Sequence, residues 1–352
     1  MKKSDETDVI IVGQGLAGSA LAMRLSLRNY KILVIDEPSQ NRSSMAAAGL
    51  FNPVTGKNMV KTWLADDLFP CLIEYYSEIE TLTKAKFFYP MPIYRPFTSI
   101  QDQNQWMGRS VEDAYSRYIA EISTAPRFGE KINDPFGGVT FRQAGYVDTP
   151  SYLQAVRKYL VERGVFQAQH FDEDKLEVHG DFILYGSRRA KKIIFCQGAR
   201  NATNRWFNRY PVQCLKGELL KVHCGWQAGV ILVRGIFMVP GPGGGEWKIG
   251  ATYNRADQEP GITAAAREEM TRKLDDLIRI PYTVTAQDWG VRPTTPDRRP
   301  IIGRHPQYDS LMIFNGFGTK GVSLAPYFSE VLIRWMENKG TMNKEADVSR
   351  FN

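Results

Sequence analysis

The chain opens with a short apolar run followed by three closely spaced glycines, and this order of residues constrains the fold more than any other part of the sequence. Residues 8–12 are mainly apolar and run directly into Gly13-Gln-Gly15-Leu-Ala-Gly18. A second apolar run then ends at Asp36. We interpret this segment as a buried strand that turns sharply into a helix, followed by a second strand.

The glycines and the acid have distinct expected roles in such a unit. Gly13 permits the tight turn, Gly15 lets a phosphate approach the backbone, and Gly18 lets the helix pack closely on the strand. The first helical turn exposes unpaired N–H groups that a pyrophosphate can fill, and Asp36 can accept hydrogen bonds from a ribose. The pattern predicts a dinucleotide-binding unit, and by itself it leaves FAD and NAD open.

Length and composition leave room for more than this unit. With 352 residues, 43% of them hydrophobic, the chain can form one large or two medium domains. Its net charge of +7 is compatible with an anionic substrate, a nucleic-acid partner or simply a basic surface, and we favour the basic surface. The four cysteines lack metal-ligand or redox spacing, so we expect no metal site and a reducing, cytoplasmic location. No apolar run is long enough to predict a membrane span.

Apolar periodicity predicts the helices. A helical stripe runs through residues 66–82, a second helix is expected around residues 111–122, and a third begins with Thr149 as N-cap and Pro150 at the first helical position. Another helix is expected to start near Thr263.

Strands, turns and loops are predicted between these helices. A strand over residues 192–196 leads into a turn at Gly198, and the basic run 188–192 is expected to form a solvated turn before it. We further predict a flexible ligand-facing loop at 43–49, a hairpin of 235–240 and 246–253 with its turn at 241–245, a strand at 283–291, and a loosely ordered tail after residue 339.

The most specific motif lies in the last quarter of the chain. Residues 289–303 read Trp-Gly-Val-Arg-Pro-Thr-Thr-Pro-Asp-Arg-Arg-Pro-Ile-Ile-Gly, and residues 311–326 contain Gly316-Phe-Gly318-Thr-Lys320-Gly321 before Ala325-Pro326. These two segments resemble the C-terminal signature of the D-amino-acid oxidase and glycine oxidase family of flavoproteins. With residues 43–49 and 145–150 and the Gly198 turn, the resemblance extends over nearly the whole chain. It implies FAD rather than NAD.

The resemblance also implies an architecture: an α/β fold in which a Rossmann-type FAD-binding domain is interleaved with an α+β substrate domain built on an antiparallel sheet. We expect residues 1–60, 140–215 and 290–352 to form the FAD domain, and residues 61–139 and 216–289 the substrate domain. No cysteine or histidine lies in the family's attachment contexts, so we expect non-covalent FAD. The implied FAD-binding residues are Gly13, Gly15, Leu16, Ala17, Gly18, Asp36, Glu37, Ser43, Ser44, Ala47, Ala48, Gly49, Gly198, Arg292, Gly316, Gly318, Thr319, Lys320 and Gly321.

For function, the resemblance implies oxidation of the C–N bond of a small amino acid or N-alkyl glycine by hydride transfer to flavin N5, giving an imine that hydrolyses. Arg292 is expected to bind the substrate carboxylate, and Lys320 to place a cation near flavin or substrate. Phe237 stands where glycine-oxidase-like relatives can carry a tyrosine, so the missing hydroxyl would come from Tyr253 or Tyr94, or the substrate is not free glycine.

Two other functions remain open at this point. The segment 316–326 also resembles the oxidase domain that acts on carboxymethylaminomethyl-uridine in tRNA, for which Arg292 would keep its role and the positive charge would suit phosphate. A flavin-binding subunit with little turnover of its own is the third interpretation. The sequence does not distinguish oxygen from another electron acceptor.

Overall fold

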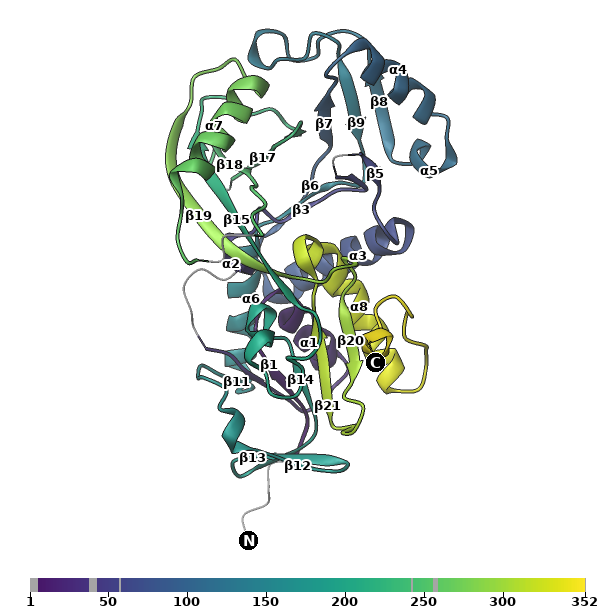
Figure 1. Cartoon of the computed structure of the whole chain (residues 1–352), viewed down its shortest axis with the longest axis vertical. Helices are drawn as coiled ribbons and strands as arrows, with labels where there is room; N and C mark the ends of the chain where they lie inside the picture. Colours follow the sequence, from purple (N-terminus) through teal and green to yellow (C-terminus); the bar gives the residue numbers. More distant parts are fainter. Residues whose placement is uncertain (1–5, 38–42, 57, 242, 256–258, 352) are drawn as a thin grey trace.

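A computed structural model describes residues 6–37, 43–56, 58–241, 243–255 and 259–351. The chain forms two main sheets, a mostly parallel one in the lower part of Figure 1 and a mostly antiparallel one in the upper part. The expected α/β class, with a Rossmann-type unit and a second antiparallel sheet, is confirmed.

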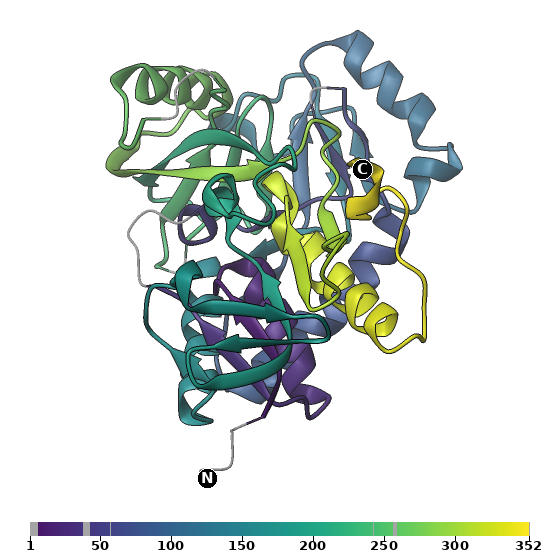
Figure 2. The ribbon, with the colours of Figure 1, turned by 60° about the horizontal axis from the view of Figure 1, so that its bottom comes forward.

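The first sheet is built around parallel strands. β1 (Thr7–Val12) lies between β2 (Ile32–Ile35) and β14 (Arg188–Phe195) in parallel, β11 (Phe166–Gln167) extends the sheet beyond β2, and β21 (Leu311–Asn315) pairs in parallel with β14. The antiparallel strands β12 (Leu176–His179), β13 (Phe182–Tyr185) and β20 (Ile301–Arg304) complete it. Figure 2 brings the β12–β13 hairpin forward.

Helices bury one face of this sheet. α1 (Leu16–Leu27) packs against α8 (Gly321–Met336), and α8 packs against α3 (Ala65–Thr83). α6 (Thr149–Glu162) lies beside α1. One apolar core joins the helices to one face of β1 and β2, and a second apolar cluster covers the other face of these strands, so both faces are apolar.

The second sheet has the order β19–β15–β18–β17–β16–β7–β9–β8, and all its pairs are antiparallel except the parallel pair β16–β7. Its strands are β7 (Ile93–Pro96), β8 (Ile119–Ser123), β9 (Gly138–Phe141), β15 (Gln213–His223), β16 (Ile231–Val233), β17 (Phe237–Pro240), β18 (Glu246–Gly250) and β19 (Thr283–Thr294). Helices α4 (Ile100–Arg109), α5 (Asp113–Ser116) and α7 (Ala264–Leu277) accompany it.

Short elements complete the chain. They are α2 (Ser43–Ala46), β3 (Leu50–Phe51), β4 (Val54–Thr55), β5 (Val60–Lys61), β6 (Phe88–Pro90), β10 (Gly145–Val147) and the 3-10 helices η1 (Gly129–Lys131), η2 (Glu173–Lys175), η3 (Gly198–Thr203), η4 (Gly318–Lys320) and η5 (Val348–Phe351).

The β15–β19 ribbon brings the two sheets together. Its ladder runs from the pair His223–Thr283 to the pair Gln213–Thr294. At the latter end β19 contacts η3 and η4, the turns that follow β14 and β21 of the first sheet. This arrangement places Arg292 of β19 beside the glycine turns of the Rossmann-type unit. The domain boundaries given above stay a prediction.

Several local predictions were right: the helix over 66–82, the helix capped by Thr263, the strand from residue 283 and the hairpin are all present. Within the hairpin turn, Pro242 lies outside the described residues. The helix predicted over 111–122 is present only as α5, over Asp113–Ser116, because Ile119 and Ile122 belong to the edge strand β8.

Four further predictions need correction. The basic run 188–192 lies inside β14, where alternation exposes Arg189 and Lys191, and Lys191 pairs with Asp8 at 2.8 Å. Asp148, not Thr149, is the N-cap of α6; the Thr149 hydroxyl donates instead to the carbonyl of Ala47. Residues 43–46 form the short helix α2, and the tail after residue 339 packs on β20, with Ala346 and Val348 buried.

Candidate active site

A cavity of about 2230 Å³ extends from the β1–α1 turn to the β15–β19 ribbon and into the space beside β17 and β18. Pockets for small ligands usually have volumes up to about 1,000 Å³, so this cavity has room for a dinucleotide together with a substrate. Nearly all the predicted site residues line it; the exceptions are Tyr94, described below, and the glycines Gly18 and Gly316.

These two glycines serve chain packing. A Cβ on Gly18 would lie 1.8 Å from the carbonyl oxygen of Gly13, so glycine is required for α1 to approach the turn. Gly316 has φ +77°, which favours glycine, and a Cβ there would lie 3.1 Å from the Thr295 side chain.

Acids and their partners lie at one end of the cavity, beyond β1 and β2. The buried Asp36 carboxylate accepts a hydrogen bond from the Gln14 backbone N–H at 2.9 Å and pairs with Arg157 at 3.1 Å. Glu37 accepts from Arg200 at 2.7 Å and pairs with His170 at 3.2 Å, and these contacts lower the pKa of Glu37. Asp36 thus helps to fix the glycine turn in addition to lying at the cavity wall.

The backbone at the cavity has the features that FAD requires. Gly15 precedes α1, and a Cβ on it would lie 3.0 Å from the Ser44 hydroxyl, which accepts from the Leu16 N–H. At the other end of the cavity, α8 begins at Gly321 with no side chain capping its first turn. One helix N-terminus suits a pyrophosphate and the other suits negative charge on a flavin ring, so these residues fit FAD.

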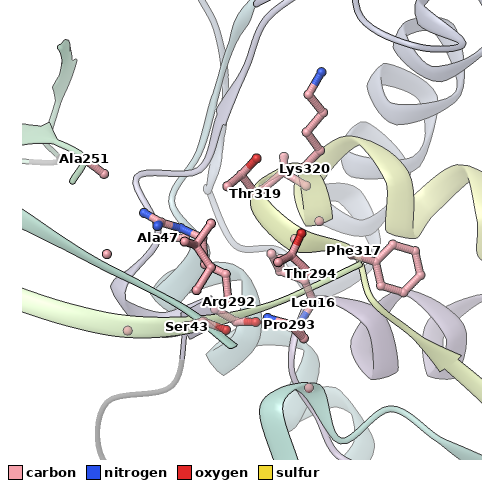
Figure 3. A pocket seen from close by; sticks show the side chains of 18 of the residues that line it. Leu16, Ser43, Ala47, Ala251, Arg292, Pro293, Thr294, Phe317, Thr319 and Lys320 are labelled. Carbon is pink, nitrogen blue, oxygen red and sulfur yellow. Dashed lines mark hydrogen bonds between the residues drawn. The ribbon is translucent and has the colours of Figure 1, made fainter. Parts of the chain in front are cut away.

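Arg292 is a half-buried cation on the cavity wall (Figure 3). Its side chain lies across Gly217 on β15, its Nη1 is 3.3 Å from the carbonyl oxygen of Thr252, and its guanidinium lies 5.1 Å from the ring centre of Tyr253. Burial lowers the pKa of Arg292 from its usual value. Within the described part of the chain, Arg292 has no carboxylate partner.

Lys320 is a second cation on the same cavity. Its Nζ donates to the hydroxyls of Thr55 at 3.0 Å and Thr62 at 3.1 Å. Burial lowers its pKa to about 8, and the nearby cations Arg299 and Arg298 act in the same direction. Figure 3 shows Lys320 and Arg292 on either side of Thr319, with the lysine amino group pointing away from the guanidinium.

The aromatic residues divide between the cavity and the core. Phe237 lines the cavity with its ring against Gly250, and Tyr253 also lines it with 66% of its surface exposed. Tyr94 does not reach the cavity, because it is fully buried and its hydroxyl donates to Asp134 at 3.0 Å. Tyr94 is therefore wrong as a source of a substrate-binding hydroxyl, and Tyr253 remains.

Several residues of this site carry no signal in a predicted motif. Thr55 and Thr62 carried no recognisable motif, although they hold Lys320. Gly217 lies in none of the motifs described above, yet its missing side chain makes room for Arg292. A glycine within a strand signals close approach by another group, and that is the signal that could have identified Gly217.

Among the residues that the structure describes, no three His, Cys, Asp or Glu side chains form a group that could hold a metal ion. In the same residues, no helix has the length and apolar character needed to cross a bilayer.

Comparison with known proteins agrees with this geometry. The family model described as FAD dependent oxidoreductase, DAO, matches residues 8–335. The chain is 26% identical over 341 residues to a bifunctional protein ThiO/ThiG of Trichormus variabilis, covering 91% of this chain but only 51% of that protein, so it spans about half of that relative's length.

Solved structures share the fold over nearly the whole chain. Glycine oxidase from Bacillus cereus superposes with a TM-score of 0.80 at 18% identity, covering 95% of this chain and 96% of the other. Iminodiacetate oxidase from Chelativorans sp. superposes with a TM-score of 0.78 at 19% identity, covering 96% and 98%.

Proposed function

Because the chain belongs to the DAO family of FAD-dependent oxidoreductases, whose cofactor is FAD, we propose that it oxidises the C–N bond of a small amino acid or N-alkyl glycine. The observation that carries the proposal is Arg292, a half-buried cation on the cavity wall with no acid paired to it among the described residues. A substrate carboxylate would satisfy it.

The planar guanidinium of Arg292 can donate two parallel hydrogen bonds to one carboxylate. Gly217 beneath it and Tyr253 beside it restrict its position, so the carboxylate would be held in one orientation. Phe237 supplies an apolar wall that helps to exclude water. Similarity to proteins named glycine oxidase and iminodiacetate oxidase supports a substrate with a glycine moiety.

FAD, when bound, accepts the hydride equivalent from the substrate carbon, and the oxidised substrate is an imine that water hydrolyses. Gly13, Gly15, Ser44 and Glu37 would hold its ADP half. The N-terminal N–H groups of α8, from Gly321, would stabilise negative charge near the ring.

The test is an anaerobic screen of the FAD-loaded protein. Glycine, sarcosine, D-alanine and iminodiacetate are mixed with it in turn, and flavin absorbance is followed, which requires no assumption about the electron acceptor. We expect at least one of them to bleach the flavin, and Arg292→Met to keep FAD while losing about 100-fold in kcat/KM. Arg163→Met, on an exposed residue, is the matched control. Failure of every amino acid and secondary amine to bleach the flavin would overturn the proposal.

The tRNA oxidase alternative is a second candidate, favoured by the cations Arg234, Arg255, Arg298 and Arg299 along the cavity wall. It predicts salt-sensitive binding of tRNA, which a free-amine oxidase does not need. If the chain is instead a flavin-binding subunit, none of the amines should bleach its flavin. Its Arg292→Ala variant should then bind candidate substrates as well as the parent does.

A further inference from the structure

The amino group of Lys320 is held by the β4–β5 hairpin. Thr55 ends β4 and Thr62 follows β5, and both hydroxyls accept from Lys320 Nζ. Thr62 is buried and Thr55 is half-buried, and both line the cavity with Lys320. The lysine is therefore fixed in place beside the space that a ligand would occupy.

Among the described residues, the hydrogen bonds around Lys320 leave one N–H of its amino group unused. The Thr62 hydroxyl donates its single proton to the carbonyl of Asn52 at 2.9 Å, so in its 3.2 Å contact with Thr55 the donor must be Thr55. Both hydroxyl protons are thus used, and both oxygens accept from Lys320. An ammonium has three N–H donors, and the threonines take two of them. The third has no protein acceptor among the residues that the structure describes and remains for a ligand.

The surroundings of Lys320 carry positive charge. No carboxylate forms an ion pair with it among the described residues, and Arg298 and Arg299 are close enough to act on it electrostatically. The one carboxylate lining the cavity from the β15–β19 ribbon, Glu218, is bonded to Thr263 and Gln287. A half-buried cation without an acid is destabilising, and an anionic ligand group would offset that cost.

We propose that Lys320, Thr55 and Thr62 form a second anion subsite, and that the substrate is an N-substituted glycine whose nitrogen substituent ends in a carboxylate. This inference rests on the proposed function, in which Arg292 binds the first carboxylate. Two separate cations on one cavity suit a substrate with two separate acidic groups. A half-buried lysine could instead act as a base that takes a proton from the substrate ammonium. The cations around Lys320 disfavour this role, because the proton would add positive charge to a cluster that is already positive.

The kinetic test compares two substrates of equal size. Iminodiacetate has the second carboxylate, and N-(carbamoylmethyl)glycine replaces it with a neutral amide. We expect the FAD-loaded protein to prefer iminodiacetate by about tenfold or more in kcat/KM, as a charge-assisted hydrogen bond allows. Lys320→Met should bring the ratio close to one. Lys61→Met removes the same charge from another cavity residue, one already paired with Asp66 at 2.6 Å, and should leave the ratio unchanged.

A binding test needs no turnover. Thiodiacetate carries two carboxylates and (methylthio)acetate carries one, and neither contains a C–N bond. Perturbation of the flavin spectrum gives their Kd values, and we expect thiodiacetate to bind about tenfold more tightly in the parent and equally in Lys320→Met. Thr55→Val, which keeps the shape of the side chain but removes one acceptor, should give an intermediate ratio and serves if Lys320→Met does not fold.

The outcomes separate the two proposals. If single-carboxylate amines are oxidised but the second carboxylate gives no advantage, the subsite is wrong and the proposed function stands. If Lys320→Met lowers kcat/KM equally for both amines, or only removes a limb of the pH profile, the lysine acts on the reaction and not on a second acid. If no amine bleaches the flavin while thiodiacetate still depends on Lys320, the reaction is wrong and the subsite stands.

Discussion

The guanidinium of Arg292 lies directly over the backbone of Gly217 on the neighbouring strand. A methyl group built on Gly217 would come within 2.0 Å of Arg292 Nη1 and 2.4 Å of its Cζ. Arg292 itself pairs with Leu215 in the β15–β19 ladder, so its side chain crosses the ribbon to reach this glycine. The absence of a side chain at Gly217 thus sets where the proposed carboxylate-binding cation can lie.

Gly217→Ala should displace Arg292 without touching the cofactor end of the cavity. We expect FAD to stay bound and the KM for a carboxylate substrate to rise about tenfold, because a bidentate hydrogen bond tolerates little displacement. Steady-state kinetics and the flavin content of the purified variant check this. Gly225→Ala is the control, since a Cβ there meets no atom within 4 Å. An unchanged KM would show that the guanidinium does not need this position.

The sequence predicted the parts of the site that are encoded locally. The order of strand, glycine turn and helix makes Gly13 and Gly15 recognisable, and the motif around Arg292 and Lys320 placed both cations on one cavity, where they are found. These features are readable because each occupies one short stretch of chain.

Contacts between distant segments were not predictable in this way. Thr55 and Thr62 reach Lys320 across more than 250 residues, and neither lies in a glycine or charge pattern. Tyr94 was misjudged for the same reason: only the folded chain shows that its neighbour Arg95 lines the cavity while Tyr94 faces the opposite side of β7. Alternation along a strand decides such cases once the register is known.

The pH dependence of ligand binding should follow Lys320. Burial lowers its pKa to about 8 from the ordinary 10.5, and only the charged form attracts a second acid. Thiodiacetate affinity should therefore be full well below pH 8 and fall as the pH rises through 8, by about fivefold between pH 7 and pH 9 if the charged form binds about tenfold more tightly. (Methylthio)acetate should show no such loss over this range. Flavin difference spectra at each pH measure both, and a flat profile for thiodiacetate would contradict the assignment.

A buried ion pair joins β18 to the N-terminus of α6, and its removal should destabilise the protein. Lys248 of β18 lies 3.2 Å from Asp148, the N-cap of α6, and the two side chains are 13% and 10% exposed. Lys248→Met leaves a buried carboxylate without its cation, so we expect a loss of about 3 kcal/mol in the free energy of unfolding.

Urea unfolding at fixed FAD concentration measures this effect. Lys221→Met is the matched control, because Lys221 pairs with Asp288 at 2.7 Å on the surface, where such pairs contribute less than about 1 kcal/mol. The double variant Lys248→Met/Asp148→Asn should recover part of the loss. Equal losses in the free energy of unfolding for Lys248→Met and Lys221→Met would show that burial does not make the Lys248–Asp148 pair more important for stability.

We predict from the positions of the nucleophiles that FAD binds non-covalently. Among the described residues lining the cavity, the only cysteine and histidine are Cys196 and His170. Both lie at the end of the cavity beside the β1–α1 turn. Cys196 is buried beneath the Gly13 turn, and burial raises the pKa of its thiol well above the usual range, which removes the thiolate that attachment requires. His170 is engaged with Glu37. Acid precipitation of the holoprotein should therefore release all the flavin into the supernatant, and Cys196→Ser should bind FAD as the parent does. Yellow colour remaining in the washed precipitate would contradict non-covalent binding.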